Sequence, residues 1–161
     1  MYTWFDYMKK QGHYITSYVI MPNHLHALIA FRSTEGVSIN KIVGNGKRFM
    51  AYALVSKLED QNKKNVLAEL SSYVNETERQ RNKLHEVFEP SFEWKDCRTQ
   101  KFIKQKLDYI HANPCRGKWN LVDRYWDYIH SSAYYYVTGE QRGYEVFDYA
   151  RLQDIDLTKA R

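Results

Sequence analysis

The sequence predicts an α+β domain, and three observations favour this class. Residues 13–20 and 24–31 are short apolar runs rich in aromatic and β-branched residues, typical of two strands, and Met-Pro-Asn between them favours a turn. Residues 38–58 and 98–112 carry helix-start residues and charged faces, typical of helices. The chain has 161 residues, 43% of them hydrophobic, which suffices for one core and excludes a collagen-like, low-complexity or mainly disordered protein.

The elements of the first half follow from local signals. Residues 2–11, before the first strand, are long enough only for a short helix. After the hairpin, Ser38 can cap a helix that reaches about Leu58. The polar residues 61–64 interrupt the pattern, and the highly charged residues 65–84 predict a second helix with a solvent-exposed face.

The second half adds one strand and two helices. Residues 87–95 alternate apolar and polar around a proline, which predicts an edge strand. Thr99 or Asp96 can cap the helix over 98–112, which ends at an Asn-Pro pair because the residue before proline is disfavoured in the α region. A short helix that ends at Gly139 is expected over 130–138, and residues 140–161 are expected to form an irregular tail. We therefore predict a single domain over 1–161, with a short N-terminal element at 1–12.

Composition limits the classes of binding partner and the cellular compartment that we expect. The net charge is +5, and 14 of the residues are Tyr. Lys and Arg meet phosphates and aromatic rings stack on bases, so a nucleic-acid partner is one interpretation; tyrosines that merely fill the core and its rim are the other. Cys97 and Cys115 form no metal-binding pattern and are expected to be reduced. Without a signal peptide or a membrane-length apolar run, we expect a cytoplasmic protein with no membrane partner.

His24 and His26 form the first candidate site. On a strand, residues two apart point to the same face, about 7 Å apart at their roots. Two imidazoles in this arrangement can converge on one metal ion, but a metal site needs at least one more protein ligand. Two half-buried histidines bonded to backbone remain the alternative.

Tyr109 marks the second candidate site, on the predicted helix 98–112. Helical periodicity places it away from the core stripe and on the same face as Asn113. Neighbouring lysines favour a phenolate, which is a competent nucleophile for a phosphodiester. A tyrosine that covers the edge of the core with its hydroxyl in water is the alternative.

Two motifs together carry a resemblance to a known family. The segment YVIMPNHLHALIAF is followed some 80 residues later by QKLDYIHANPCRGKWNLV. In this order they resemble the single-tyrosine HUH transposases of the REP-associated branch, whose signature is Met-Pro-Asn-His-x-His and then a helix that ends in Tyr-Ile-x-x-Asn-Pro. GNGKRFMAY at 44–52 and HSSAYYY at 130–136 are also similar to segments of that family. The resemblance covers roughly residues 14–138.

The resemblance implies a fold, a chemistry and roles. The fold would be a ferredoxin-like antiparallel sheet with helices packed on one face. The activity would be cleavage and rejoining of single-stranded or hairpin DNA through a 5′-phosphotyrosine at Tyr109. His24, His26 and Asn113 would hold Mg²⁺ or Mn²⁺, although relatives often have Gln at the position of Asn113. We expect the basic residues Lys47, Arg48, Lys101, Lys104 and Arg116 to bind DNA.

One departure from the family pattern concerns the N-terminal side. Only 23 residues precede His24, so the family's first strand is expected to be missing. An open sheet edge there would favour a homodimer formed by strand pairing. Two alternatives to the transposase stay open. One is a degenerate transposase that only binds DNA hairpins, and the other is a metal-dependent nuclease that uses His24 and His26 to activate water.

Overall fold

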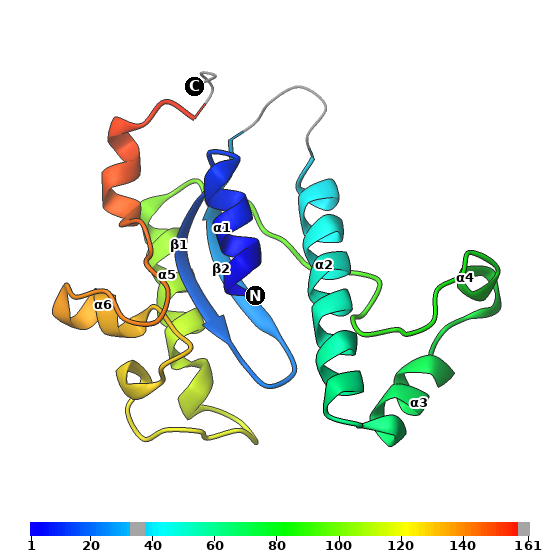
Figure 1. Ribbon diagram of the computed structural model, residues 1–161. Coiled ribbons are helices and arrows are strands. Elements are labelled where there is room, and N and C mark those ends of the chain that lie inside the picture. Colours follow the sequence, from blue (N-terminus) through cyan, green and yellow to red (C-terminus); the bar gives the residue numbers. More distant parts are fainter. Residues whose placement is uncertain (33–37, 158–161) are drawn as a thin grey trace. The chain divides into compact units, whose positions relative to one another are not determined.

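Two antiparallel strands and the helices around them confirm the mixed α+β class (Figure 1). The computed structural model describes residues 1–32 and 38–157, and within them the sheet has two strands. The helices and strands are α1 (Tyr2–Lys10), β1 (Tyr14–Ile20), β2 (Leu25–Ala30), α2 (Ile39–Asp60), α3 (Lys64–Ser72), α4 (Glu76–Gln80), α5 (Gln100–Ala112) and α6 (Ala133–Thr138), with short 3₁₀ helices at η1 (Asn113–Cys115), η2 (Tyr125–Asp127) and η3 (Tyr149–Asp154).

The predicted hairpin forms, and its register fixes which side chains share a face. The backbone N–H of Met21 donates to the carbonyl of His24 at 2.8 Å, which closes the turn. Val19 lies opposite His26 in the ladder, so these two side chains point to the same face. A bulge falls between Ile15 and Ser17. The hairpin therefore carries His26 on the face that holds the buried Val19.

Helices cover both faces of this hairpin, rather than the single face that the family resemblance implies. On one face, Phe5 of α1 packs edge-on against Tyr18 at 5.4 Å between ring centroids. On the other face, Val19 and Met21 are buried against Ile110 of α5. Figure 1 shows α1 in front of the strands and α5 behind them. α5 thus lies on the face that carries His26.

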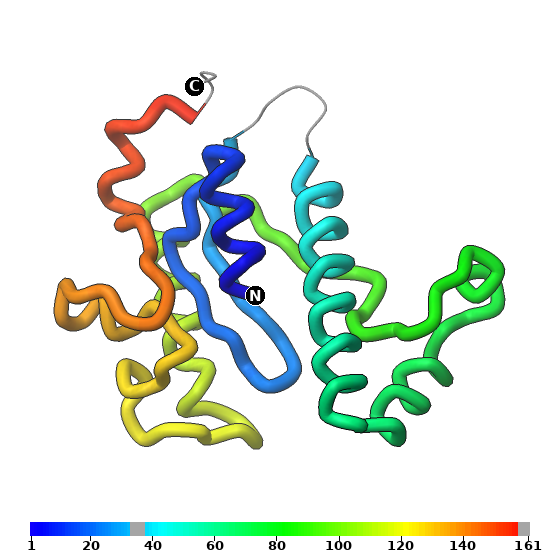
Figure 2. The backbone as a smooth tube through the Cα atoms, viewed as in Figure 1, coloured from blue at the N-terminus to red at the C-terminus, as the bar shows by residue number. Residues whose placement is uncertain are grey.

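C-terminal segments occupy the edge of β1 that β2 leaves open. The N–H of Ile20 donates to the carbonyl of His130 at 2.9 Å, and the N–H of Ser132 donates to the carbonyl of Tyr18 at 3.0 Å. The N–H of Phe147 donates to the carbonyl of Ile15 at 2.9 Å. Figure 2 shows this stretch, in orange, passing beside β1. Backbone pairing therefore extends the sheet on this side without a third regular strand.

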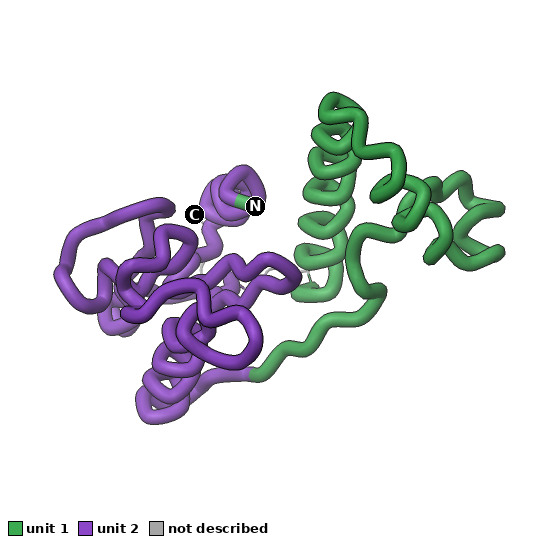
Figure 3. Tube along the Cα trace, turned by 90° about the horizontal axis from the view of Figure 1, so that it is seen from below, with its two compact units in different colours: residues 1, 37–95 green, residues 2–36, 96–161 purple. Residues whose placement is uncertain are grey.

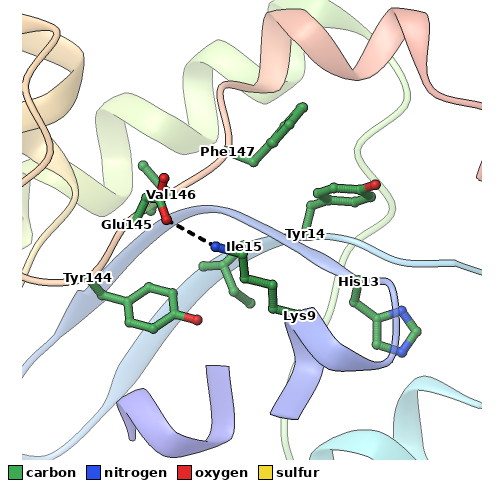
Figure 4. A pocket seen from close by; sticks show the side chains of 8 residues that line it. All are labelled: Lys9, His13, Tyr14, Ile15, Tyr144, Glu145, Val146 and Phe147. Carbon is green, nitrogen blue, oxygen red and sulfur yellow. Dashed lines mark hydrogen bonds and ion pairs between the residues drawn. The ribbon is translucent and has the colours of Figure 1, made fainter. Parts of the chain in front are cut away.

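A small cavity of about 80 Å³ lies where residues 144–147 pass β1 and the end of α1 (Figure 4). The ammonium of Lys9 and a carboxylate oxygen of Glu145 are 3.0 Å apart at this place. Both side chains are well exposed, so this ion pair contributes little to stability. The buried contacts of the neighbouring Val146 hold the segment instead.

The chain forms two compact units, each described by itself (Figure 3). The hairpin unit comprises Tyr2–Gly36 and Asp96–Arg161, and the helical unit comprises Met1 and Val37–Lys95. The predicted tail 140–161 belongs to the hairpin unit. Part of it forms η3, which Asp148 caps by accepting from the N–H of Ala150 at 2.9 Å; residues 158–161 lie outside the described residues.

Two predictions in the helical unit are wrong. The helix expected over 65–84 is interrupted, because α3 ends at Ser72 and Asn75 caps α4 by accepting from the N–H of Glu78 at 2.9 Å. Residues 87–95 form no strand. Their carbonyls bind a side chain instead: the ammonium of Lys47 donates to two of them, at residues 89 and 91, each at 2.7 Å.

The predicted capping residues are confirmed for the two long helices. Ser38 accepts from the N–H of Lys41 at 3.2 Å, and Thr99 accepts from the N–H of Phe102 at 3.2 Å. Gly139 ends α6 with a φ of +80°, which a residue with a side chain rarely adopts. Neither Cys97 nor Cys115 forms a disulfide in the described part of the chain. Among the described helices, none combines the length and apolarity that crossing a membrane requires.

Candidate active site

His24 and His26 lie together on the α5-facing side of the hairpin, as their spacing predicts. His24 is the last residue of the turn and His26 is the second residue of β2. Their ring centroids are 4.9 Å apart with planes inclined by 68°, and both side chains are half-buried. The two imidazoles are therefore close enough to bind a common ion.

The end of α5 brings Asn113 to His24. Asn113 caps the helix, where its backbone N–H donates to the carbonyl of Ile110. Its side-chain Nδ2 donates to the carbonyl of Tyr109 at 2.9 Å. This bond orients the amide, so that Oδ1 is turned toward Nε2 of His24 at 3.3 Å. Two segments separated by 89 residues thus meet at one point.

A second amide sets the tautomer of His24. Oδ1 of Asn23 lies 2.7 Å from Nδ1 of His24, and an amide oxygen can only accept, so Nδ1 carries the proton. In the neutral ring, Nε2 then presents a lone pair to Oδ1 of Asn113, which is also an acceptor. A proton on Nε2 or a cation bound by both atoms satisfies this contact at 3.3 Å.

His26 is held in the form that binds metal. Burial lowers the pKa of His26, and the nearby His24 and Lys106 lower it further. A neutral imidazole has a lone pair available for a cation, whereas an imidazolium repels one. The surroundings of His26 therefore favour the neutral imidazole.

Tyr109 lies beside this pair and is open to solvent. Its ring is 5.2 Å from the ring of His26, with planes inclined by 70°, and its side chain is 48% exposed. Leu107 and Ile110, on the predicted core stripe of α5, are buried. Helical periodicity therefore placed Tyr109 correctly off the core, and the fold places its phenol next to the candidate ligands.

The donors present fit a divalent cation with an incomplete protein shell. No cluster of three or more His, Cys, Asp or Glu side chains suited to a metal occurs in the described part of the chain. The third donor here is an amide oxygen, from Asn113, beside the nitrogens of His24 and His26. Oxygen ligands suit Mg²⁺ and Mn²⁺, while imidazole favours the transition metal of the two. Three protein donors would leave positions on such a cation for further ligands.

The predicted DNA-binding residues are divided between the two units. Lys101, Lys104 and Arg116 are exposed in the unit that holds Tyr109, and the ammonium of Lys104 is 3.4 Å from a carboxylate oxygen of Asp108. Arg48 is exposed in the helical unit, with its guanidinium 5.3 Å from the centre of the Phe49 ring.

Lys47 has a structural use that its sequence context did not indicate. Besides its two bonds to carbonyls, its ammonium lies 5.5 Å from the centre of the Phe92 ring. Burial lowers the pKa of Lys47, whereas the carboxylates of Glu89 and Glu86 raise it. Lys47 therefore fastens the segment around residue 90 to α2 and has little donor capacity left for phosphate.

One neighbour of the site was expected from the sequence and another was missed. The expected one is Lys106, whose ammonium is 5.8 Å from the centre of the Tyr109 ring and 5.0 Å from that of Phe102. The spacing from Lys106 to Tyr109 is i,i+3, which brings the two side chains to the same side of the helix. The contact of Asn23 with His24 had no such signal, because it depends on the turn.

Another polar cluster lies on a different side of α5. Nε2 of the buried His111 is 3.1 Å from the hydroxyl of Ser17 and 2.9 Å from that of Ser132. Ser132 also accepts from the N–H of Tyr18 at 3.0 Å. Burial lowers the pKa of His111 to about 4, although Asp108 raises it slightly. These bonds join α5, β1 and residue 132 and keep the helix in place behind the hairpin.

Comparison with known proteins adds no relative. No protein-family model matches the chain, and neither a curated protein nor a solved structure does. We therefore infer the function from the motifs and from the geometry of His24, His26, Tyr109 and Asn113.

Proposed function

We propose that the protein cleaves and rejoins single-stranded or hairpin DNA through a covalent phosphotyrosine at Tyr109. One observation carries the proposal. An exposed phenol lies 5.2 Å, ring to ring, from one of two adjacent histidines, and an oriented amide oxygen faces the other at 3.3 Å. This group of side chains combines a nucleophile with the donors for a divalent cation.

Tyr109 supplies the nucleophile. Its phenolic oxygen attacks the scissile phosphorus, the Tyr–O–P bond forms and the P–O3′ bond breaks. The phenol proton leaves to water, and the departing 3′ oxygen takes up a proton to become a free 3′-OH. The reverse attack by a 3′-OH on the phosphotyrosine restores the DNA and the phenol. The phosphodiester is conserved in the covalent link, so rejoining needs no ATP.

The other residues orient the metal ligands and neutralise the negative charge that develops on the phosphate. His24, His26 and Asn113 would hold Mg²⁺ or Mn²⁺, which supplies positive charge to a non-bridging phosphate oxygen and to the leaving oxygen. Asn23 fixes the tautomer of His24, and the carbonyl of Tyr109 fixes the amide of Asn113. Lys106 places a further positive charge beside the Tyr109 ring, where the attacking oxygen is negative.

A nuclease that activates water and a non-cutting DNA-binding module make different predictions. Cleavage by water survives loss of Tyr109 and leaves no protein–DNA bond. A binding module holds DNA in a salt-sensitive way and forms no adduct with any metal. The position of the Tyr109 phenol beside His26 favours the covalent route over both.

The test is a covalent-adduct assay with a matched tyrosine control. A pool of single-stranded and hairpin oligonucleotides, labelled at the 3′ end, is incubated with the protein and Mn²⁺ or Mg²⁺. We expect a labelled band that survives denaturing electrophoresis, requires the metal and is lost in Tyr109→Phe. Tyr7→Phe is the control, because Tyr7 is 44% exposed on α1, close to the 48% of Tyr109. An equal adduct in Tyr109→Phe would contradict the proposal.

A further inference from the structure

We propose that a second site, a cavity lined by aromatic side chains on another side of α5, takes one unpaired base of the bound DNA strand. This inference rests on the proposed function and names a subsite for its substrate. The cavity has a volume of about 200 Å³. Its walls include Lys104, Asp108, His111, Tyr125, Tyr136 and Tyr149.

The aromatic walls suit a planar ring. The rings of His111 and Tyr125 are parallel to within 2°, with centroids 6.5 Å apart. Base–aromatic stacking is the usual way in which proteins bind unpaired bases. A base that enters the cavity can therefore stack on the half-buried ring of Tyr125, whereas His111 is 6% exposed and contributes only part of the cavity wall.

The polar groups at the rim select for a nucleotide rather than for an apolar ligand. Lys104 and Asp108 are both exposed, and their charged groups are 3.4 Å apart. The ammonium of Lys104 can meet a backbone phosphate. The carboxylate of Asp108 can accept from the exocyclic amino group of cytosine, adenine or guanine, which thymine lacks. Asp108 also disfavours a bare anion in the cavity, so the base enters and its phosphate stays outside.

The cavity walls are held in place before any ligand arrives. Ser17 and Ser132 fix Nε2 of His111, and the hydroxyl of Tyr136 donates to the carbonyl of Thr16 at 2.7 Å. Rigid walls reduce the entropy lost on binding. His111 is therefore a flat surface in a fixed orientation rather than a mobile side chain.

The cavity and the candidate active site belong to the same helix but to different faces. Lys104, Asp108 and His111 follow one another at helical spacing, whereas Tyr109 is turned by about 100° from Asp108. A helix with its side chains is about 10 Å across, so a strand of a few nucleotides spans the two faces. A base held in the cavity would position the strand relative to the phenol of Tyr109.

The test uses mononucleotides, which need no cleavage. The ring resonances of His111 and Tyr125 are followed by NMR during titration with dCMP, dAMP, dTMP and, as a base-free control, deoxyribose 5-phosphate. We expect shifts with dCMP and dAMP, weaker shifts with dTMP and none with the sugar phosphate. Tyr125→Ala should weaken binding about 10-fold, and Tyr125→Phe, which keeps the stacking surface, should not. Tyr7→Ala on α1 serves as the distant control.

The outcomes separate this inference from the proposed function. Equal shifts with the sugar phosphate, no shift with any nucleotide, or full binding by Tyr125→Ala would overturn the base site. Adduct formation at Tyr109 is measured on the same preparations. An adduct without nucleotide binding rejects the cavity and keeps the enzyme, and nucleotide binding without an adduct does the reverse.

Discussion

The amide oxygen of Asn113 faces Nε2 of His24 at 3.3 Å, although the two residues are 89 positions apart in the chain. Each partner is oriented by another bond: Asn113 by the carbonyl of Tyr109 and His24 by the amide of Asn23. The contact between the end of α5 and the hairpin turn thus places the Asn113 oxygen and the His24 nitrogen side by side, close to Tyr109. This relationship leads to the first prediction.

Loss of the Asn113 oxygen should weaken metal binding. We expect Asn113→Ala to lower the affinity for Mn²⁺ at least about 10-fold, because a ligand is removed. Asn113→Asp should bind at least as tightly as the native chain, because a carboxylate is a stronger ligand for a hard cation. Titration calorimetry with Mn²⁺ measures both. An Asn113→Ala variant with native affinity would show that the amide is not a ligand.

Removing the charge of Lys106 should raise the pKa of the neighbouring His26. Its charge lowers the pKa of His26 together with burial and His24, so Lys106→Gln should raise that pKa toward the ordinary value. The measurement is an NMR titration of the His26 ring in metal-free protein. Lys101→Gln, an exposed position on the same helix, is the control and should leave His26 unchanged. A shift in the control alone would assign the effect to another part of α5.

Acid should destabilise the hairpin unit through His111. Burial lowers the pKa of His111 in the folded chain to about 4, below the ordinary histidine value of 6.5. The unfolded chain therefore binds a proton between these values that the folded chain does not, and stability falls as pH drops from about 6.5 to about 4. This site alone accounts for a loss on the order of 3 kcal/mol, with the full stability present above pH 6.5.

Unfolding by urea at a series of pH values measures this loss. The pKa of His13 and that of His26 are also lowered by burial, so the native chain has contributions from all three histidines. His111→Gln keeps a hydrogen-bonding group but does not titrate. It should flatten the dependence between pH 6.5 and 4, and an unchanged slope would place the proton elsewhere.

Substitutions of Lys47 and Arg48 should have different effects, because Lys47 has a structural role and Arg48 is expected to bind DNA. Lys47→Met removes the donor to two carbonyls, so amide hydrogen exchange should rise around residues 89–92. Arg48→Ala, one residue along and exposed, should leave that exchange unchanged and should reduce DNA affinity with a smaller salt dependence. Exchange and fluorescence anisotropy at several salt concentrations test the pair. Equal exchange in both variants would contradict the structural role of Lys47.

Much of the secondary structure could be predicted from local sequence. The hairpin, the caps at Ser38 and Thr99 and the end of α6 at Gly139 depend on neighbouring residues, and all are confirmed. The strand expected over 87–95 failed for a tertiary reason. Alternating residues make a strand only when a neighbouring strand pairs with it, and here the lysine of α2 takes two of its carbonyls.

The candidate site was only partly predictable. The spacing of His24 and His26 and the helical position of Tyr109 follow from period two and period 3.6. The orientation of the Asn113 amide and the tautomer of His24 do not, because each depends on a hydrogen bond formed only in the folded chain. The cavity beside His111 could not be predicted either, because its walls come from segments that are distant in the sequence.

The central claim is that Tyr109 forms the bond to DNA, and mass spectrometry of the purified adduct tests it most directly. Trypsin releases Tyr109 in the peptide of residues 107–116, LDYIHANPCR. Of the 14 tyrosines in the chain, this peptide contains only Tyr109. After nuclease trimming, the account predicts that this peptide carries a 5′-linked nucleotide. A nucleotide on a peptide with a different tyrosine, or cleaved DNA with no modified peptide, would contradict the account.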